Sequence, residues 1–140
     1  MAGGWLSAAA SLLHIGCIIG GEGWYRFFGA GEEIAMAAAA GKIWPNLLTF
    51  GIAVVLAIWA TYAFSGAGRI RRLPFLRTGL VVISAIYLLR ALALIQALAL
   101  NPAVLTTFDV VSSLIVLVYG LAYAIGTANA WKAMRKEVIA

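Results

Sequence analysis

The amino-acid sequence predicts an all-α integral membrane protein, with four transmembrane helices in a compact bundle and a short interfacial helix between the first two. Of its 140 residues, 64% are hydrophobic and 11% are charged. Soluble domains carry about 45–50% apolar and about 25% charged residues. Four segments are long and apolar enough to cross a bilayer, which takes about 20 residues. Most arginines and lysines gather beside these segments instead of spreading along the chain.

A single transmembrane domain is predicted, with spans at about residues 5–21, 44–64, 78–100 and 103–131. Aromatic belts mark the ends of membrane spans, and tryptophans lie near the predicted ends at Trp5, Trp24, Trp44 and Trp131. Only the letters LNP separate the third and fourth spans. This tight turn predicts that Pro102 begins the last helix, because proline is favoured in a first helical turn.

The segment 22–43 is too polar to cross a bilayer and too apolar for a simple loop. After Gly31, the residues Glu32 and Glu33 occupy the first turn of an alanine-rich helix, where the helix dipole favours anions. Gly41 is typical of a helix end. A short helix on the outer face is therefore predicted. It is either a linker that seals the bundle or a lid that carries Glu32 or Glu33 onto a polar site.

The positive charges predict the orientation. They lie in the loop before the third span and in the C-terminal segment, at Arg69, Arg71, Arg72, Arg77, Lys132, Arg135 and Lys136. Cytoplasmic segments are enriched in lysine and arginine. With four spans the two basic segments share a side, so both termini are predicted to be cytoplasmic. These clusters account for the net charge of +5, so the expected partner is the lipid bilayer and not nucleic acid.

The run WYRFFGAGEEIA, residues 24–35, resembles a motif of small, uncharacterised bacterial inner-membrane proteins of similar length with four predicted spans. The resemblance covers most of the chain and implies a location in a bacterial inner membrane. That family has no assigned activity, so no functional residue is carried over from it.

Helices in lipid pack through small and weakly polar residues, and such residues recur at helical spacing in the spans. The stripe of the first span comprises Ser7, Ala10, Ser11, His14, Cys17 and Gly21, and that of the second comprises Asn46, Thr49, Ala53, Ala57 and Ala60. The third span offers a mainly apolar stripe of Ile83, Tyr87, Arg90, Leu94 and Ala97, and the fourth offers Thr106, Asp109, Ser112, Ser113, Gly120, Tyr123 and Thr127. We expect these stripes to face the bundle interior. On the other side of the first span, Gly16 and Gly20 have the spacing of a helix-packing seam. A homodimer through this seam and a larger membrane complex are the alternatives for a protein partner.

Arg90 is the residue that bears most on function. Helices rise 1.5 Å per residue, so it lies about 18 Å from the cytoplasmic start of its span and about 15 Å from the outer end. Its guanidinium cannot shed its proton, and an unpaired charge at this depth costs several kcal/mol. We expect Asp109, about 9 Å below the outer end of the fourth span, to neutralise it. His14, about 10 Å below the outer end of the first span, and Glu32 or Glu33 complete the predicted network.

The predicted ligand-binding residues are Arg90, Asp109, His14, Glu32, Glu33 and Tyr87, the last on the same stripe as Arg90. One interpretation is a site that binds or transports a small anionic or carbonyl-bearing ligand. The other is an accessory or scaffold subunit of a larger membrane complex, whose buried charges only set helix packing. An enzyme or a metal or haem protein ranks third, because the sequence has no P-loop, nucleophile elbow or zinc-protease motif. We predict no catalytic or metal-binding residues, and the sequence does not assign a cofactor.

Overall fold

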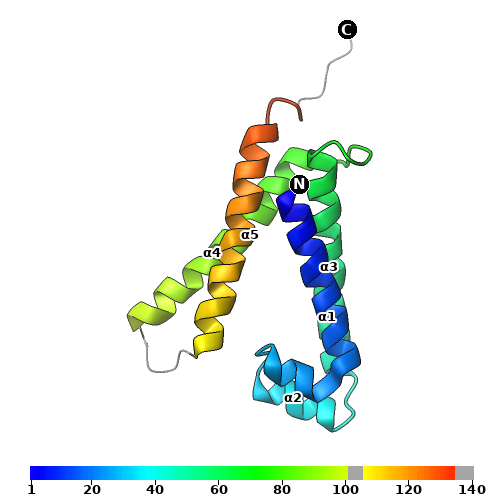
Figure 1. The fold of residues 1–140 in the computed structure, drawn as a ribbon, viewed down its shortest axis with the longest axis vertical. Helices are drawn as coiled ribbons and strands as arrows, with labels where there is room; N and C mark the ends of the chain where they lie inside the picture. Colours follow the sequence, from blue (N-terminus) through cyan, green and yellow to red (C-terminus); the bar gives the residue numbers. More distant parts are fainter. Residues whose placement is uncertain (101–105, 135–140) are drawn as a thin grey trace. The chain divides into compact units, whose positions relative to one another are not determined.

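The computed structural model describes residues 1–100 and 106–134, and every regular element within them is a helix. The helices are α1 (Ala2–Phe27), α2 (Glu32–Ala39), α3 (Trp44–Gly66), α4 (Leu76–Leu100) and α5 (Thr107–Ala130) (Figure 1). Four of them, α1, α3, α4 and α5, are long and apolar enough to cross a membrane. The predicted fold class is confirmed, including the short helix between the first two spans. The chain is a multi-pass membrane protein.

The kink in α1 lies at Gly21, the predicted end of the first span. Two helical segments meet there, and the second continues to Phe27. Gly21 has φ 62° and ψ −146°, a conformation that glycine adopts easily because it has no Cβ. The first helical segment therefore ends at Gly21, as predicted, and the chain changes direction before the second segment begins. The predicted turn at Pro102 and the basic residues Arg135 and Lys136 lie outside the described residues.

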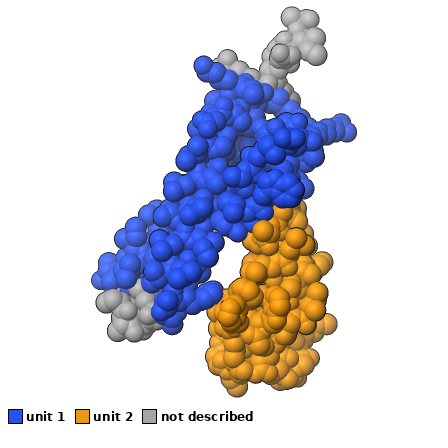
Figure 2. Space-filling view, in the orientation of Figure 1, with its two compact units in different colours: residues 1–6, 59–140 blue, residues 7–58 orange. Residues whose placement is uncertain are grey.

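The chain divides into two compact units, which Figure 2 shows in different colours. One comprises residues 1–6 and 59–140, and the other comprises residues 7–58. Helices α1 and α3 each contribute residues to both units.

In the unit of residues 7–58, α1 and α3 pack through the predicted stripe of small polar residues. Cys17 and Ala53 are buried, and the Ser11 hydroxyl donates a hydrogen bond to the Ala53 carbonyl oxygen at 2.8 Å. Tyr25 is buried as well, and its hydroxyl donates to Asn46 Oδ1 at 3.0 Å. These bonds satisfy polar groups that would be costly to leave unpaired in an apolar environment.

The ends of α2 follow the predicted start and stop signals. Gly31 precedes the helix with φ 99°, and Gly41 follows it with φ 69°. Both angles lie in the region that favours glycine. The amides of Gly41 and Lys42 donate to the Ala38 and Ala37 carbonyls, each at 3.0 Å. The last carbonyls of the helix are thus satisfied by the turn that ends it.

Gly16 and Gly20 pack against an indole ring of their own chain. A Cβ at Gly16 would lie 2.8 Å from Trp24 Cζ3, and one at Gly20 would overlap the same ring. A partner helix at this seam would therefore meet Trp24 as well as the two glycines. The homodimer through Gly16 and Gly20 stays a prediction.

In the other unit, α4 and α5 form a closely packed pair. The buried residues of α5 include four of its predicted stripe: Ser113, Gly120, Tyr123 and Thr127. A Cβ at Gly120 would lie 2.8 Å from Leu88 Cδ2 and 3.2 Å from the Leu88 backbone nitrogen. The absence of a side chain at Gly120 therefore lets the two backbones approach closely.

Candidate functional site

Arg90 lies near the middle of α4, a helix without an internal break. It lies 14 residues after Leu76 and 10 residues before Leu100, the two ends of α4. At 1.5 Å per residue it is about 21 Å from one end and about 15 Å from the other. Its side chain is exposed, and Nη1 donates a hydrogen bond to the Ser113 hydroxyl oxygen at 3.4 Å. The contacted hydroxyl is neutral and belongs to a residue only 3% exposed.

Asp109 lies closer to the start of its helix than predicted, and its hydrogen-bond partner is a neighbouring residue in the sequence. It occupies the first turn of α5, where Thr106 is the residue that precedes the helix. Its carboxylate accepts hydrogen bonds from the Thr106 amide at 2.9 Å and from the Thr106 hydroxyl at 2.7 Å. The Thr106 hydroxyl oxygen in turn accepts from the Asp109 amide at 3.2 Å. This reciprocal arrangement is a capping box, and it corrects the expectation that Asp109 is the direct partner of Arg90.

The sequence contains the pattern of a capping box. Thr106 and Asp109 have the spacing of a residue before a helix and an acid three positions later, directly ahead of an apolar run.

Among the described residues, the ion pairs within 4.0 Å involve Arg26 and not Arg90.

His14 is half-buried on α1, in the unit of residues 7–58. Its Nδ1 lies 2.8 Å from the Ala10 carbonyl oxygen. Because a carbonyl oxygen only accepts, Nδ1 carries the hydrogen in the neutral ring, and Nε2 keeps its lone pair. The ring could therefore accept a hydrogen bond at Nε2. Its predicted meeting with Arg90 stays a prediction.

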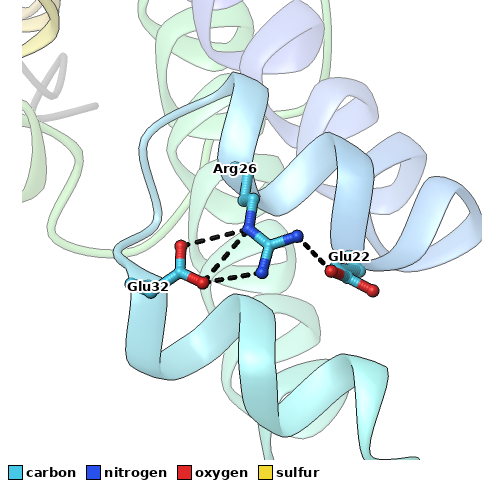
Figure 3. A network of polar contacts seen from close by, with 3 residues as sticks. All are labelled: Glu22, Arg26 and Glu32. Carbon is cyan, nitrogen blue, oxygen red and sulfur yellow. Dashed lines mark hydrogen bonds and ion pairs between the residues drawn. The ribbon is translucent and has the colours of Figure 1, made fainter.

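Glu32 belongs to an ion-pair network at the junction of α1 and α2, shown in Figure 3. The Arg26 guanidinium donates to Glu32 from Nε at 3.0 Å and from Nη2 at 2.6 Å. Its Nη1 pairs with Glu22, one turn earlier on α1. These hydrogen bonds from Arg26 lower the pKa of Glu32 below its usual value. Glu33, the other candidate of the proposed lid, is exposed.

Arg26 was not among the predicted site residues. Its signal was the spacing of Glu22 and Arg26, four residues apart, which places opposite charges side by side on a helix. The bond to Glu32 depends on the turn at Gly29 and Gly31, both with positive φ. Spacing alone does not give the direction of such a turn.

Tyr87 is buried in an aromatic cluster and is 6% exposed. Its ring centroid lies 4.9 Å from that of Trp59 and 5.5 Å from that of Tyr119, both in edge-to-face geometry. Tyr123 packs on the same ring and donates its hydroxyl to the Trp59 carbonyl oxygen at 2.9 Å. The ring of Tyr87 therefore supports the helix packing beside Arg90.

A cavity of about 90 Å³ lies near the other end of α5. Its lining includes Gly3, Ala63, Tyr123 and Thr127. The Thr127 hydroxyl oxygen is buried and makes no hydrogen bond to the residues that the structure describes. A cavity of this size can hold ordered water that would satisfy such a group. Thr127 is 14 residues from Ser113 on α5, or about 21 Å, so the cavity is separate from the Arg90 contact.

Within residues 1–100 and 106–134, no three histidine, cysteine or acidic residues gather in a way that could hold a metal ion. Comparisons of the chain with protein-family models, with curated proteins and with solved structures found no match. The basis for a functional inference is therefore the chemistry of Arg90 and its surroundings.

Proposed function

We propose that this chain is a small bacterial inner-membrane protein that binds a ligand through Arg90. The ligand would be small, and it would present a carboxylate, phosphate or carbonyl oxygen to the guanidinium. The proposal includes the predicted orientation, with both termini in the cytoplasm and Arg90 at the border of the outer half of the membrane. The location in a bacterial inner membrane rests on the sequence resemblance of residues 24–35.

The main support for this proposal is that Arg90 contacts a neutral group. The guanidinium has five N–H donors and a permanent charge, and its hydrogen bond within the described residues goes to Ser113. The acidic side chain of α5, Asp109, accepts hydrogen bonds from the amide and the hydroxyl of Thr106. An unneutralised charge at this depth costs several kcal/mol. A bound oxyanion would offset this cost and would match the planar fork of the guanidinium.

A second candidate function is that of an accessory subunit in a larger membrane complex. The observation that favours it is the exposure of Leu89 and Leu92, which are 66% and 53% exposed beside Arg90 on α4. A helix of another membrane protein could pack on these leucines and supply a carboxylate to Arg90. Under this proposal the arginine selects a protein partner and binds no small ligand.

Thermal unfolding of the purified protein in detergent tests the first proposal. The probes are octanoate, methyl octanoate and inorganic phosphate, which separate carboxylate, carbonyl and phosphate recognition. A ligand at 100 times its dissociation constant stabilises the folded state by about 2.7 kcal/mol. We expect at least one probe to raise the melting temperature of the wild type and to have no effect on Arg90→Gln.

Thr106→Ala is the matched control for the thermal shift. It removes the capping hydroxyl of α5 and lowers stability by about 1 kcal/mol, but it should leave the ligand-induced shift intact. If no probe shifts the wild type, the ligand proposal is wrong for these three chemistries. A photocrosslinking residue in place of Leu89 then tests the accessory function, which predicts an adduct with one membrane protein that Arg90→Gln abolishes.

A further inference from the structure

The loop between α3 and α4 carries a dense positive charge without a nearby acid in the sequence. Arg69, Arg71, Arg72 and Arg77 lie within nine residues, and no acidic residue occurs anywhere between Glu33 and Asp109. Four like charges this close together repel each other, and a bound anion would reduce this repulsion.

The loop is held in a defined shape by residues at the end of α3. The Ser65 hydroxyl donates to the Arg71 carbonyl oxygen at 3.1 Å and accepts from the Leu73 amide at 3.0 Å. The Tyr62 hydroxyl donates to the Pro74 carbonyl oxygen at 3.3 Å. The next residue, Phe75, has a positive φ of 51° and is 84% exposed. This left-handed backbone is strained for an aromatic residue, and the phenyl ring of Phe75 is largely exposed.

Two of the arginines are fixed against the end of α5. Arg72 Nη2 donates to the Met134 carbonyl oxygen, and Arg77 Nη2 donates to the Trp131 carbonyl oxygen. The Arg77 guanidinium also lies 4.6 Å from the ring centroid of Trp131. Its Nε is buried and has no hydrogen-bond partner among the described residues. The carbonyl group of Trp131 orients the Arg77 guanidinium but does not cancel its full charge.

An open hollow of about 650 Å³ lies at these two arginines. Its lining combines the polar residues Arg72, Arg77 and Thr78 with the apolar residues Leu73, Phe75 and Met134. Its lining residues belong to the loop that follows α3, the start of α4 and the turn that follows α5, and all three helices are long enough to cross a membrane. The ends of such helices meet the headgroup layer of a bilayer.

We propose that this hollow binds the headgroup of an anionic phospholipid, with the phosphate on Arg72 and Arg77. The fork of a guanidinium matches two phosphate oxygens, and Thr78 offers a hydroxyl to the same group. The apolar lining and the exposed Phe75 ring suit the glycerol and the first acyl carbons, which inorganic phosphate does not have. This lipid site is separate from the ligand site proposed at Arg90, and neither depends on the other.

Native mass spectrometry of the full chain in detergent tests the lipid site. The probes are phosphatidylglycerol and phosphatidylcholine with the same acyl chains, each titrated separately. We expect the wild type to bind one phosphatidylglycerol at least tenfold more tightly than phosphatidylcholine. Arg72→Gln/Arg77→Gln should lose this preference. Arg69→Gln/Arg71→Gln removes the same charge from the same loop outside the hollow, and it should keep the preference.

Arg72→Lys/Arg77→Lys covers the case in which the glutamine variant does not fold, because it keeps both charges. It should lower the preference at least threefold, since an ammonium group cannot bind two phosphate oxygens as a planar fork. An equal loss in the two glutamine variants would show diffuse attraction and overturn the proposal. Displacement of the lipid by inorganic phosphate at equal concentration would also overturn it, because the hollow would then recognise phosphate alone.

Discussion

At the scale of single residues, Arg26 links the end of α1 to the start of α2. It pairs with Glu22 on its own helix and with Glu32 on the next. All three side chains are considerably exposed to solvent. The pairs therefore contribute little to the free energy of folding. Their main effect is to favour one geometry of the connection. They hold the connection at Gly29 and Gly31 in the conformation that starts α2.

The Glu32 contact predicts a pH dependence of this connection. The pKa of Glu32 is lowered from its ordinary value of 4.5 by hydrogen bonds from Arg26. A carboxylate with a lowered pKa stabilises the folded arrangement above its ordinary pKa, and the contribution is lost as pH falls through the folded value. Between pH 7 and pH 5 the connection should be unchanged, and below about pH 4.5 it should loosen. Hydrogen exchange of a peptide covering residues 22–35, corrected for intrinsic exchange, measures the effect.

Glu33→Gln is the control for this pH effect, because Glu33 neighbours Glu32 and is exposed. It should keep the acid-induced rise in exchange. Glu32→Gln should show fast exchange at pH 7 already and little further change on acidification. The same acid response in Glu32→Gln as in the wild type would assign the titration to another group.

The residues at Arg90 show where sequence reasoning succeeds and where it stops. Its depth follows from counting along an apolar run, and the structure keeps it at mid-span. Its partner does not follow from counting, because Asp109 could bond either across to α4 or back to Thr106. The backbone amide and hydroxyl of Thr106 are local and need no helix to be placed first, and they hold the carboxylate.

At the scale of elements, close helix packing depends on single glycines. Gly120 lies where α5 approaches Leu88 of α4, whereas a Cβ at Gly126 on the same helix would meet no atom within 4 Å. The apolar length of a span predicts its existence but not which of its glycines contacts a neighbour. Likewise, the kink at Gly21 is a backbone angle that hydropathy does not record.

Gly120→Ala should therefore destabilise the protein, and Gly126→Ala should not. The added methyl group at Gly120 would overlap Leu88 and force α4 and α5 apart, at a cost of about 1–3 kcal/mol. At Gly126 the alanine gains helix propensity, worth up to about 1 kcal/mol. Unfolding of the two variants in mixed micelles of increasing dodecyl sulfate content compares them directly. Equal stability of the two would mean that α4 and α5 do not approach at Gly120.

At the scale of the whole molecule, the fold class follows from composition because a bilayer leaves few alternatives. A chain with 64% hydrophobic residues has to satisfy its backbone hydrogen bonds internally, and the four long helices do so. The candidate site is less predictable, because it depends on individual donors and acceptors that lie on different helices. His14 and Arg90, for example, belong to different units of the chain.

The orientation is the remaining whole-molecule prediction. Moving the four arginines of the loop to the outer side would work against the membrane potential, at about 9 kcal/mol for 100 mV. Cys17 is the chain's one cysteine, so Cys17→Ser gives a background for single-cysteine labelling. Ala40→Cys, after α2, should react with a membrane-impermeant maleimide on intact spheroplasts. Ile70→Cys, in the arginine loop, should react only after lysis. Labelling of both variants in detergent is the control, and the reverse pattern on spheroplasts would place the termini outside.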